Sequence, residues 1–158
     1  MTEGLLPASL TCVALGLALA HERPARVLIA MTACLAGAAA GSFLEPVASA
    51  SIVLRLAAWL SLALAAGAGL MRTGLPWPWT LPLALNAGLW AGAQAGASVE
   101  LPAALTGLAA VLPARLLVAH GRGIALRVAA SWLVTIGVLN AAIPLTTPTP
   151  GYVRDHME

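Results

Sequence analysis

The chain has 158 residues, of which 60% are hydrophobic and only 9% are charged, and its mean hydropathy is +0.91. Charged residues make up about a quarter of an ordinary soluble domain, so this composition excludes one and indicates a polytopic membrane protein. The net charge of +2 comes entirely from arginine, since lysine is absent. A nucleic-acid-binding surface is therefore excluded, and the arginines report on topology instead.

Six apolar segments are long enough to cross a bilayer, which takes about 20 residues with a range of roughly 17–25. We place them at about residues 4–20, 27–43, 52–71, 79–98, 103–120 and 124–143. The sequence predicts an all-α integral membrane protein, a bundle of six transmembrane helices over residues 1–143 with the fourth helix central. A short irregular extracytoplasmic tail is expected over residues 144–158. The chain starts without the basic region of a signal peptide, so the first segment is interpreted as a retained helix.

Charge alternates between the loops. Arginine is concentrated in the odd-numbered loops: Arg23, Arg26, Arg72 and Arg122. The second and fourth loops carry Glu45 and Glu100, with Arg55 near them. By the positive-inside rule the odd loops are cytoplasmic. We therefore expect a multi-pass membrane protein with both termini extracytoplasmic.

Glycines at four-residue spacing mark two segments as packing helices. Gly88, Gly92 and Gly96 form one stripe on a helix, and Gly37 with Gly41 forms a second. Such stripes let a neighbouring backbone approach closely. We expect these five glycines to lie at helix–helix interfaces.

A polar row adjoins the first stripe. Asn86, Trp90 and Gln94 repeat at helical spacing, and Glu100 follows. Polar groups inside a membrane segment face the bundle interior or a water-filled path. One interpretation is a solute path along Asn86, Gln94 and Glu100. Glu45 and Arg55 then complete its outer mouth. The alternative is a packing helix with ordinary ion pairs at the interface.

Sulfur supplies the only candidate metal ligands. Cys12 and Cys34 lie at nearly equal distances from the first loop, so antiparallel helices would hold them at one depth, and Met31 shares a face with Cys34. Sulfur ligands suit a soft ion such as Cu(I), but Cys and Met are also ordinary apolar fillers. The histidines lack metal-ligand spacing, and no catalytic motif is present. We expect neither catalytic residues nor a cofactor, and no enzyme.

Several stretches carry a resemblance to a known family. They are Leu35-Ala-Gly-Ala-Ala-Ala-Gly41, Leu44-Glu-Pro46, the run from Ala84 to Pro102 that ends in Glu-Leu-Pro, and Gly123-Ile-Ala-Leu-Arg-Val128. In this layout the chain resembles the hydrogenase/urease accessory family (HupE/UreJ), small six-helix bacterial membrane proteins thought to be nickel or cobalt permeases. The resemblance implies the six-helix fold, a location in the bacterial inner (plasma) membrane, outward termini and an acidic position at Glu100. It departs at the family's histidines, because Ala93 and Ala97 occupy the positions of a histidine pair.

Two functions remain open from the sequence. The first is a permease-like carrier for a small cationic solute, a nickel-type metal by resemblance. The second is a non-catalytic structural or assembly subunit that docks through its glycine stripes onto a larger membrane complex or a second copy of itself. Both place the protein in the lipid bilayer, and neither involves nucleic acid.

Overall fold

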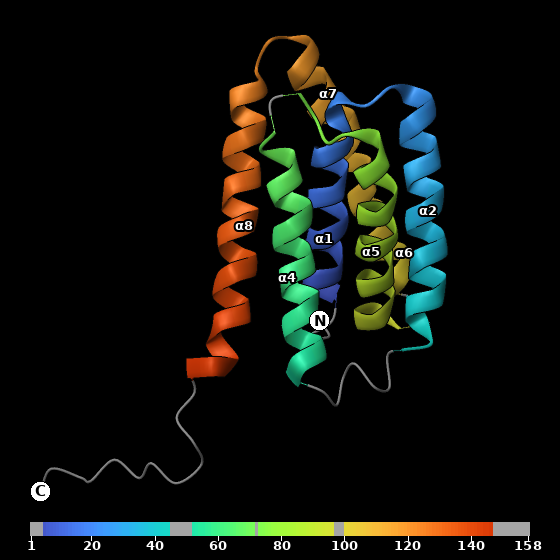
Figure 1. The fold of residues 1–158 in the computed structure, drawn as a ribbon, viewed down its shortest axis with the longest axis vertical. Coiled ribbons are helices and arrows are strands. Elements are labelled where there is room, and N and C mark those ends of the chain that lie inside the picture. Colours follow the sequence, from blue (N-terminus) through green and yellow to red (C-terminus); the bar gives the residue numbers. More distant parts are fainter. Residues whose placement is uncertain (1–4, 45–51, 72, 97–99, 147–158) are drawn as a thin grey trace, which may run out of the picture.

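The computed structural model describes residues 5–44, 52–71, 73–96 and 100–146, and these form helices and connections with no strand among them. The elements in chain order are α1 (Leu5–Ala18), η1 (Leu19–His21), α2 (Pro24–Ser42), α4 (Ile52–Gly69), α5 (Trp77–Ala95), α6 (Glu100–Leu105), η2 (Thr106–Ala110), α7 (Val111–Ala119) and α8 (Gly123–Thr146). The all-α prediction is confirmed for the part of the chain that is described (Figure 1).

Four helical stretches are long and apolar enough to cross a membrane: Pro24–Ser42, Ile52–Gly69, Glu100–Ala119 and Gly123–Ile143. By length and composition, these stretches are typical of a multi-pass membrane protein. The apolar helix Leu5–His21 is shorter. Helix α5 has 19 residues, but prolines and the amides of Asn86 and Gln94 lower its hydropathy. These two helices nevertheless lie inside the same bundle (Figure 1).

Helix α8 continues to Thr146, whereas the sequence placed the start of an irregular tail at residue 144. A proline removes one backbone hydrogen bond, but a membrane helix tolerates this loss when the freed groups are satisfied locally. Pro144 therefore does not end α8. The remainder of the expected tail, residues 147–158, lies outside the described residues.

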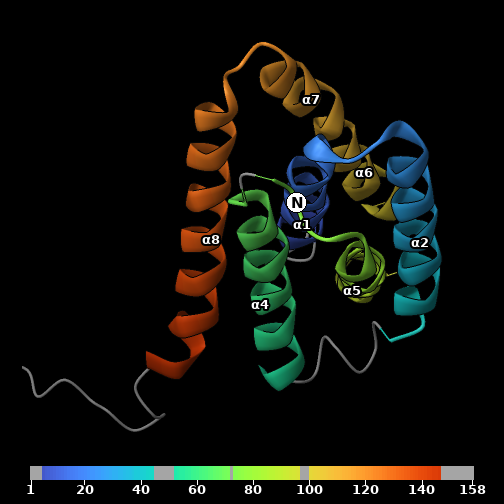
Figure 2. The same ribbon diagram turned by 45° about the horizontal axis from the view of Figure 1, so that its top comes forward.

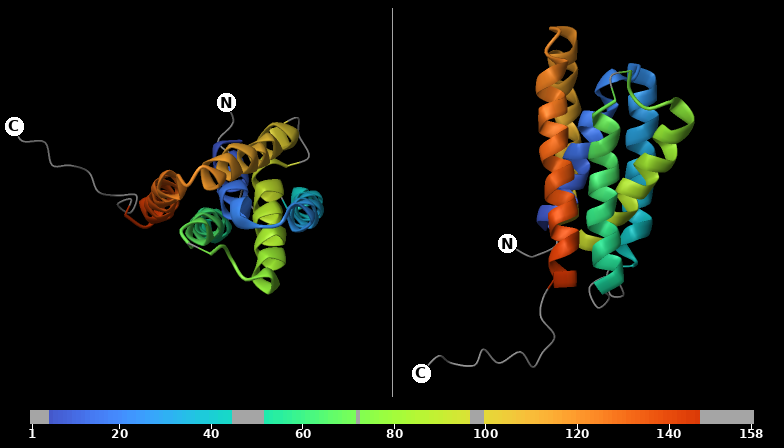
Figure 3. Two further views of the ribbon diagram at one scale, coloured as in Figure 1. Left: turned by 90° about the horizontal axis from the view of Figure 1, so that it is seen from above. Right: turned by 60° about the vertical axis from the view of Figure 1, so that its left-hand side comes forward.

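Helix α1 is the most enclosed element of the bundle. Most of its residues are buried, including Thr11, Cys12 and Leu15. It packs against α4, α5, α8 and the segment from α6 to α7. Helix α5, which the sequence placed at the centre, packs between α2 on one side and α1 with α4 on the other (Figure 3). Helices α1 and α5 therefore both lie at the centre of the bundle, and only α5 was predicted there from the sequence.

The connections alternate between two ends of the bundle. Those after α1, α4 and α7 gather at one end, called here the arginine end because it carries Arg23, Arg26, Arg115, Arg122 and Arg127 (Figures 1 and 2). Helices α2 and α5 end at the opposite end, where the first and last described residues also lie (Figure 1). Arg55 and Glu100 belong to this opposite end.

The fifth apolar segment is not one continuous α-helix. Its middle, Thr106–Ala110, is a 3₁₀ helix that packs against α1 through two glycines. A Cβ on Gly107 would lie 2.8 Å from the carbonyl oxygen of Ser9, and one on Gly16 would lie 3.0 Å from the backbone nitrogen of Val111. The tighter 3₁₀ turn lets the two backbones approach here, which the sequence analysis did not anticipate.

Candidate functional site

The interface between α2 and α5 is built from four glycines. A Cβ on Gly37 or Gly41 would collide with the carbonyl oxygens of Leu85 and Leu89 on α5. A Cβ on Gly88 or Gly92 would collide with the carbonyl oxygens of Cys34 and Ala38 on α2. The two stripes that the sequence analysis singled out therefore lie against each other. Helix α5 is inclined relative to α2 (Figure 3), as is common where glycines at four-residue spacing cross.

Gly96, the last glycine of the expected stripe, lies at the end of α5. It follows the last residue of α5 with φ 64° and its N–H donates to the carbonyl oxygen of Gly92. Glycine adopts this left-handed backbone without a steric penalty and commonly ends helices for that reason. Gly96 therefore ends the helix. It is also buried, and its expected role in helix packing stays a prediction.

Asn86 binds across the bundle to α4. Its Nδ2 donates to Oγ of Ser61 over 2.7 Å, and Ser61 is buried at 2% exposure. Both residues lie nine positions after the start of their antiparallel helices, so the bond sits near mid-depth. This half of the expected polar path is a satisfied contact between helices.

Gln94 differs from Asn86. Both polar atoms of its side chain, Nε2 and Oε1, are buried and have no hydrogen-bond partner among the described residues. At 100° per residue, Gln94 projects between the direction of Asn86, which meets α4, and that of Ala87 and Ala91, which pack with α1 in one core cluster. The amide therefore faces the junction of α1, α4 and α5 near the opposite end of the bundle.

The expected mouth is described only in part. Glu100 is the first residue of α6 and is half-buried. Arg55 lies exposed in the first turn of α4. Both belong to the end of the bundle at which α5 terminates. Glu45, the third member of the expected mouth, lies outside the described residues.

The two cysteines meet in the core. Cys12 and Cys34 are fully buried free thiols, and their side chains lie within hydrogen-bonding reach of each other. They belong to one core cluster, against which Met31 packs from a half-buried position. The described residues hold no group of three or more His, Cys, Asp or Glu side chains that could bind a metal. A metal held here would thus depend on two thiols and one thioether.

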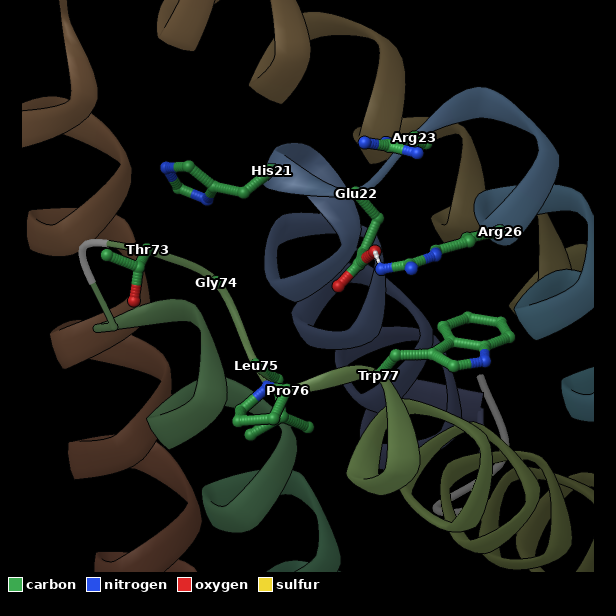
Figure 4. A pocket seen from close by; sticks show the side chains of 9 residues that line it. All are labelled: His21, Glu22, Arg23, Arg26, Thr73, Gly74, Leu75, Pro76 and Trp77. Atoms are coloured by element: carbon green, nitrogen blue, oxygen red, sulfur yellow. Dashed lines mark ion pairs between the residues drawn. The ribbon is translucent and has the colours of Figure 1, made fainter.

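A polar pocket at the arginine end was not predicted from the sequence. Its cavity of about 340 Å³ is lined by side chains from η1, the start of α2 and the connection before α5. Glu22 is 9% exposed, and its Oε2 lies 3.5 Å from Nη1 of Arg26. The guanidinium of Arg26 in turn lies 5.2 Å from the ring centre of Trp77 (Figure 4). His21 points away from this ion pair (Figure 4).

These contacts explain what the aromatic and basic residues of this end do. Trp77 and Arg26 make a cation–π contact that ties the start of α5 to the start of α2. Arg115 on α7 is half-buried and its Nη1 donates to the backbone oxygen of Glu22 over 3.0 Å. Trp79 is 67% exposed and fits an interfacial anchor. The connections at the arginine end are thus joined by side chains.

Two features of the sequence indicate contacting residues that were not predicted. Glu22 and Arg26 stand four positions apart, the spacing of an ion pair on one helix face. Ser61 is a buried hydroxyl in an apolar helix, and such groups commonly bond across membrane helices. The first signal identifies its own partner. The second does not identify Asn86, because sequence spacing within one helix carries no information on which helix faces meet.

Comparison with protein-family models, with curated proteins and with solved structures finds no match to this chain. Its function is therefore inferred from the geometry above.

Proposed function

We propose that the protein is a permease-like carrier for a small cationic solute, with six membrane-spanning helices. The observation that carries this proposal is the side-chain amide of Gln94, which is buried without a partner among the described residues. Burying an unpaired amide costs about 1–3 kcal/mol. A binding role explains why the chain keeps this unfavourable burial, because a bound cargo would supply the missing hydrogen-bond partner.

The surroundings of Gln94 support a path for cations at the end where α5 terminates. The residue lies two helical turns beyond Asn86 on α5, and Glu100 begins the next helix at the same end. The amide oxygen of Gln94 and the carboxylate of Glu100 supply negative charge density for a cation. Asn86 contributes indirectly, because its bond to Ser61 fixes α5 against α4.

Oxygen donors define the class of cargo. Amide and carboxylate oxygens prefer hard cations, whereas imidazole nitrogen suits nickel. The resemblance to the HupE/UreJ family suggests a metal permease, but Ala93 and Ala97 lack ligand groups. The proposed cargo is therefore a hard or organic cation, carried in a family-like bundle.

The alternative of an assembly subunit assumes docking through the glycine stripes. Gly37 and Gly41 pack against Gly88 and Gly92 within one chain, so these stripes are not available to a partner. A subunit would need to dock through another face. The carrier is accordingly the better-supported proposal.

Uptake into proteoliposomes tests the carrier. The protein would be reconstituted and offered Mg²⁺, Mn²⁺, Co²⁺, Ni²⁺ and tetramethylammonium. We expect uptake of a hard or organic cation that Gln94→Leu abolishes. Asn140→Leu is the matched control, since that amide bonds to the backbone oxygen of Ile136 on its own helix. Uptake that Gln94→Leu leaves intact, or no uptake of any probe, would refute the role of the amide.

Equilibrium dialysis with ⁶³Ni at neutral pH tests the class of cargo separately. We expect no high-affinity binding by the purified protein, because nitrogen ligands are missing and the sulfur group suits softer ions. Micromolar binding that Glu100→Gln abolishes would restore nickel as the cargo.

Cysteine labelling of intact cells tests the proposed orientation. Thr149→Cys, in the tail, should react with a membrane-impermeant maleimide, and Thr73→Cys, at the arginine end, should be protected until the cells are lysed. The physical reason is the positive-inside rule applied to the arginine end. Labelling in the reverse pattern would invert the topology.

A further inference from the structure

An apolar groove opens on the side of the bundle between α2 and the segment from η2 to α7. It encloses about 660 Å³, and its walls include Val27, Leu28 and Met31 from α2 and Leu108, Leu112 and Arg115 from the other side. Leu28 and Leu112 are 66% and 64% exposed, so the groove opens toward the region that lipid occupies.

The groove follows from the way α2 is held. Among the described elements, α2 packs extensively against α5 alone. The glycine contacts draw α2 tightly onto α5 and leave its other flank separated from η2 and α7. The walls of the groove are therefore set by α2 on one side and by η2 and α7 on the other.

The length of the groove matches one leaflet. On the side of η2 and α7 it extends from Leu105 to Arg115, roughly 15 Å at the rise of a helix. The hydrocarbon core of a bilayer is about 30 Å thick. The groove thus runs from the arginine end to about mid-depth, which is the reach of one acyl chain.

The polar end of the groove carries a positive charge that is only partly used. Arg115 makes one hydrogen bond, to the backbone oxygen of Glu22, and its guanidinium has five N–H donors. The carboxylate of Glu22 is paired with Arg26. Arg115 and the neighbouring Arg23 therefore leave net positive charge at this end, with donors of Arg115 unpartnered among the described residues.

We propose that this groove binds an anionic phospholipid, with one acyl chain between α2 and α7 and the phosphate on Arg115. Basic pockets between membrane helices are a recurrent type of site for anionic headgroups. The apolar walls recognise the chain and the guanidinium recognises the phosphate. This site is independent of the proposed carrier path, which lies on α5 near the opposite end.

Native mass spectrometry of the intact protein in mild detergent tests the proposal, with phosphatidylglycerol and phosphatidylcholine of identical acyl chains as probes. We expect phosphatidylglycerol to bind preferentially and Arg115→Gln to reduce its affinity roughly five-fold, the effect of one arginine near a membrane surface. Arg127→Gln is the matched control, because Arg127 is a half-buried arginine of the same end that does not line the groove. Arg115→Lys should retain most of the preference and shows that loss in Arg115→Gln is not misfolding.

A second pair of variants tests the groove without changing charge. Ala109 lines the groove and is exposed, so Ala109→Trp should fill it and displace the lipid. Ala129→Trp, on the exposed side of α8, should have no effect. The proposal is wrong if both lipids bind equally, if Arg115→Gln and Arg127→Gln lose the same affinity, or if Ala109→Trp binds phosphatidylglycerol as the unchanged protein does.

Discussion

Two faces of α5 are held in different ways. On one face, Gly88 and Gly92 bring the backbone of α5 against that of α2, where a single added Cβ would collide with a carbonyl oxygen. On the other face, Asn86 reaches Ser61 with a side-chain hydrogen bond, and Gln94 reaches no described partner. The first face relies on shape alone, and the second relies on polar groups of which one is unsatisfied.

This difference has energetic consequences in a membrane. Lipid is as apolar as leucine, so helices associate through close packing and interhelical hydrogen bonds. Backbone contact cannot adapt to an added atom, whereas a hydrogen bond between membrane helices contributes only about 0.6 kcal/mol on average. We therefore expect the glycine face to be intolerant of change and the polar face to be adjustable.

The largest effect is expected at Gly41. Gly41→Leu would hold α2 and α5 apart and should prevent the accumulation of folded protein. Ala40→Leu, one residue earlier on the exposed side of α2, should be tolerated. Expression and the monodisperse fraction in size-exclusion chromatography would measure both. Equal yields of the two variants would contradict the glycine contact.

A smaller change sharpens the same point. Gly88→Ala adds one methyl group where the carbonyl of Cys34 already lies, and overpacking of this kind costs about 1–3 kcal/mol. Gly67 on α4 has no atom within 4 Å of an added Cβ. Gly67→Ala should leave stability unchanged or raise it by up to about 1 kcal/mol. Thermal unfolding in detergent would measure both variants. If the midpoints of Gly88→Ala and Gly67→Ala shift alike, the number of glycines matters and their position does not.

The smallest effect is expected for the bond between Asn86 and Ser61. A double-mutant cycle with Asn86→Leu and Ser61→Ala should give a coupling energy of about 0.6–1.7 kcal/mol, the range for such bonds in membrane proteins. Chemical unfolding of the four proteins would supply it. A coupling energy of zero would mean that the two side chains do not bond.

The sequence predicts helices well because their signals are local. Segments of sufficient length and a four-residue glycine spacing both act within one helix, so the segment positions and the stripes of α2 and α5 could be predicted. The end of α5 could not be predicted, because Gly96 has the same spacing as Gly88 and Gly92 and its positive φ is a property of the folded chain.

Partners and enclosure could not be predicted because they depend on which faces meet. Helix α1 is apolar on every side, so nothing in its pattern indicates that it is surrounded. The 3₁₀ turn at Thr106–Ala110 packs against Gly16 on α1, and this contact cannot be predicted from the pattern of either segment alone. The pairing of Asn86 with Ser61, and the missing partner of Gln94, are likewise properties of the assembled bundle.

Unfolding of Gln94→Leu beside Asn86→Leu tests whether the buried amide of Gln94 is unsatisfied. Removing a buried, unpaired amide should raise stability by up to about 1–3 kcal/mol, whereas removing Asn86 breaks a bond and should lower it. We expect the two midpoints of thermal unfolding, measured in one detergent without cargo, to shift in opposite directions. If Gln94→Leu destabilises the protein as much as Asn86→Leu does, Gln94 has a structural partner and the account is wrong.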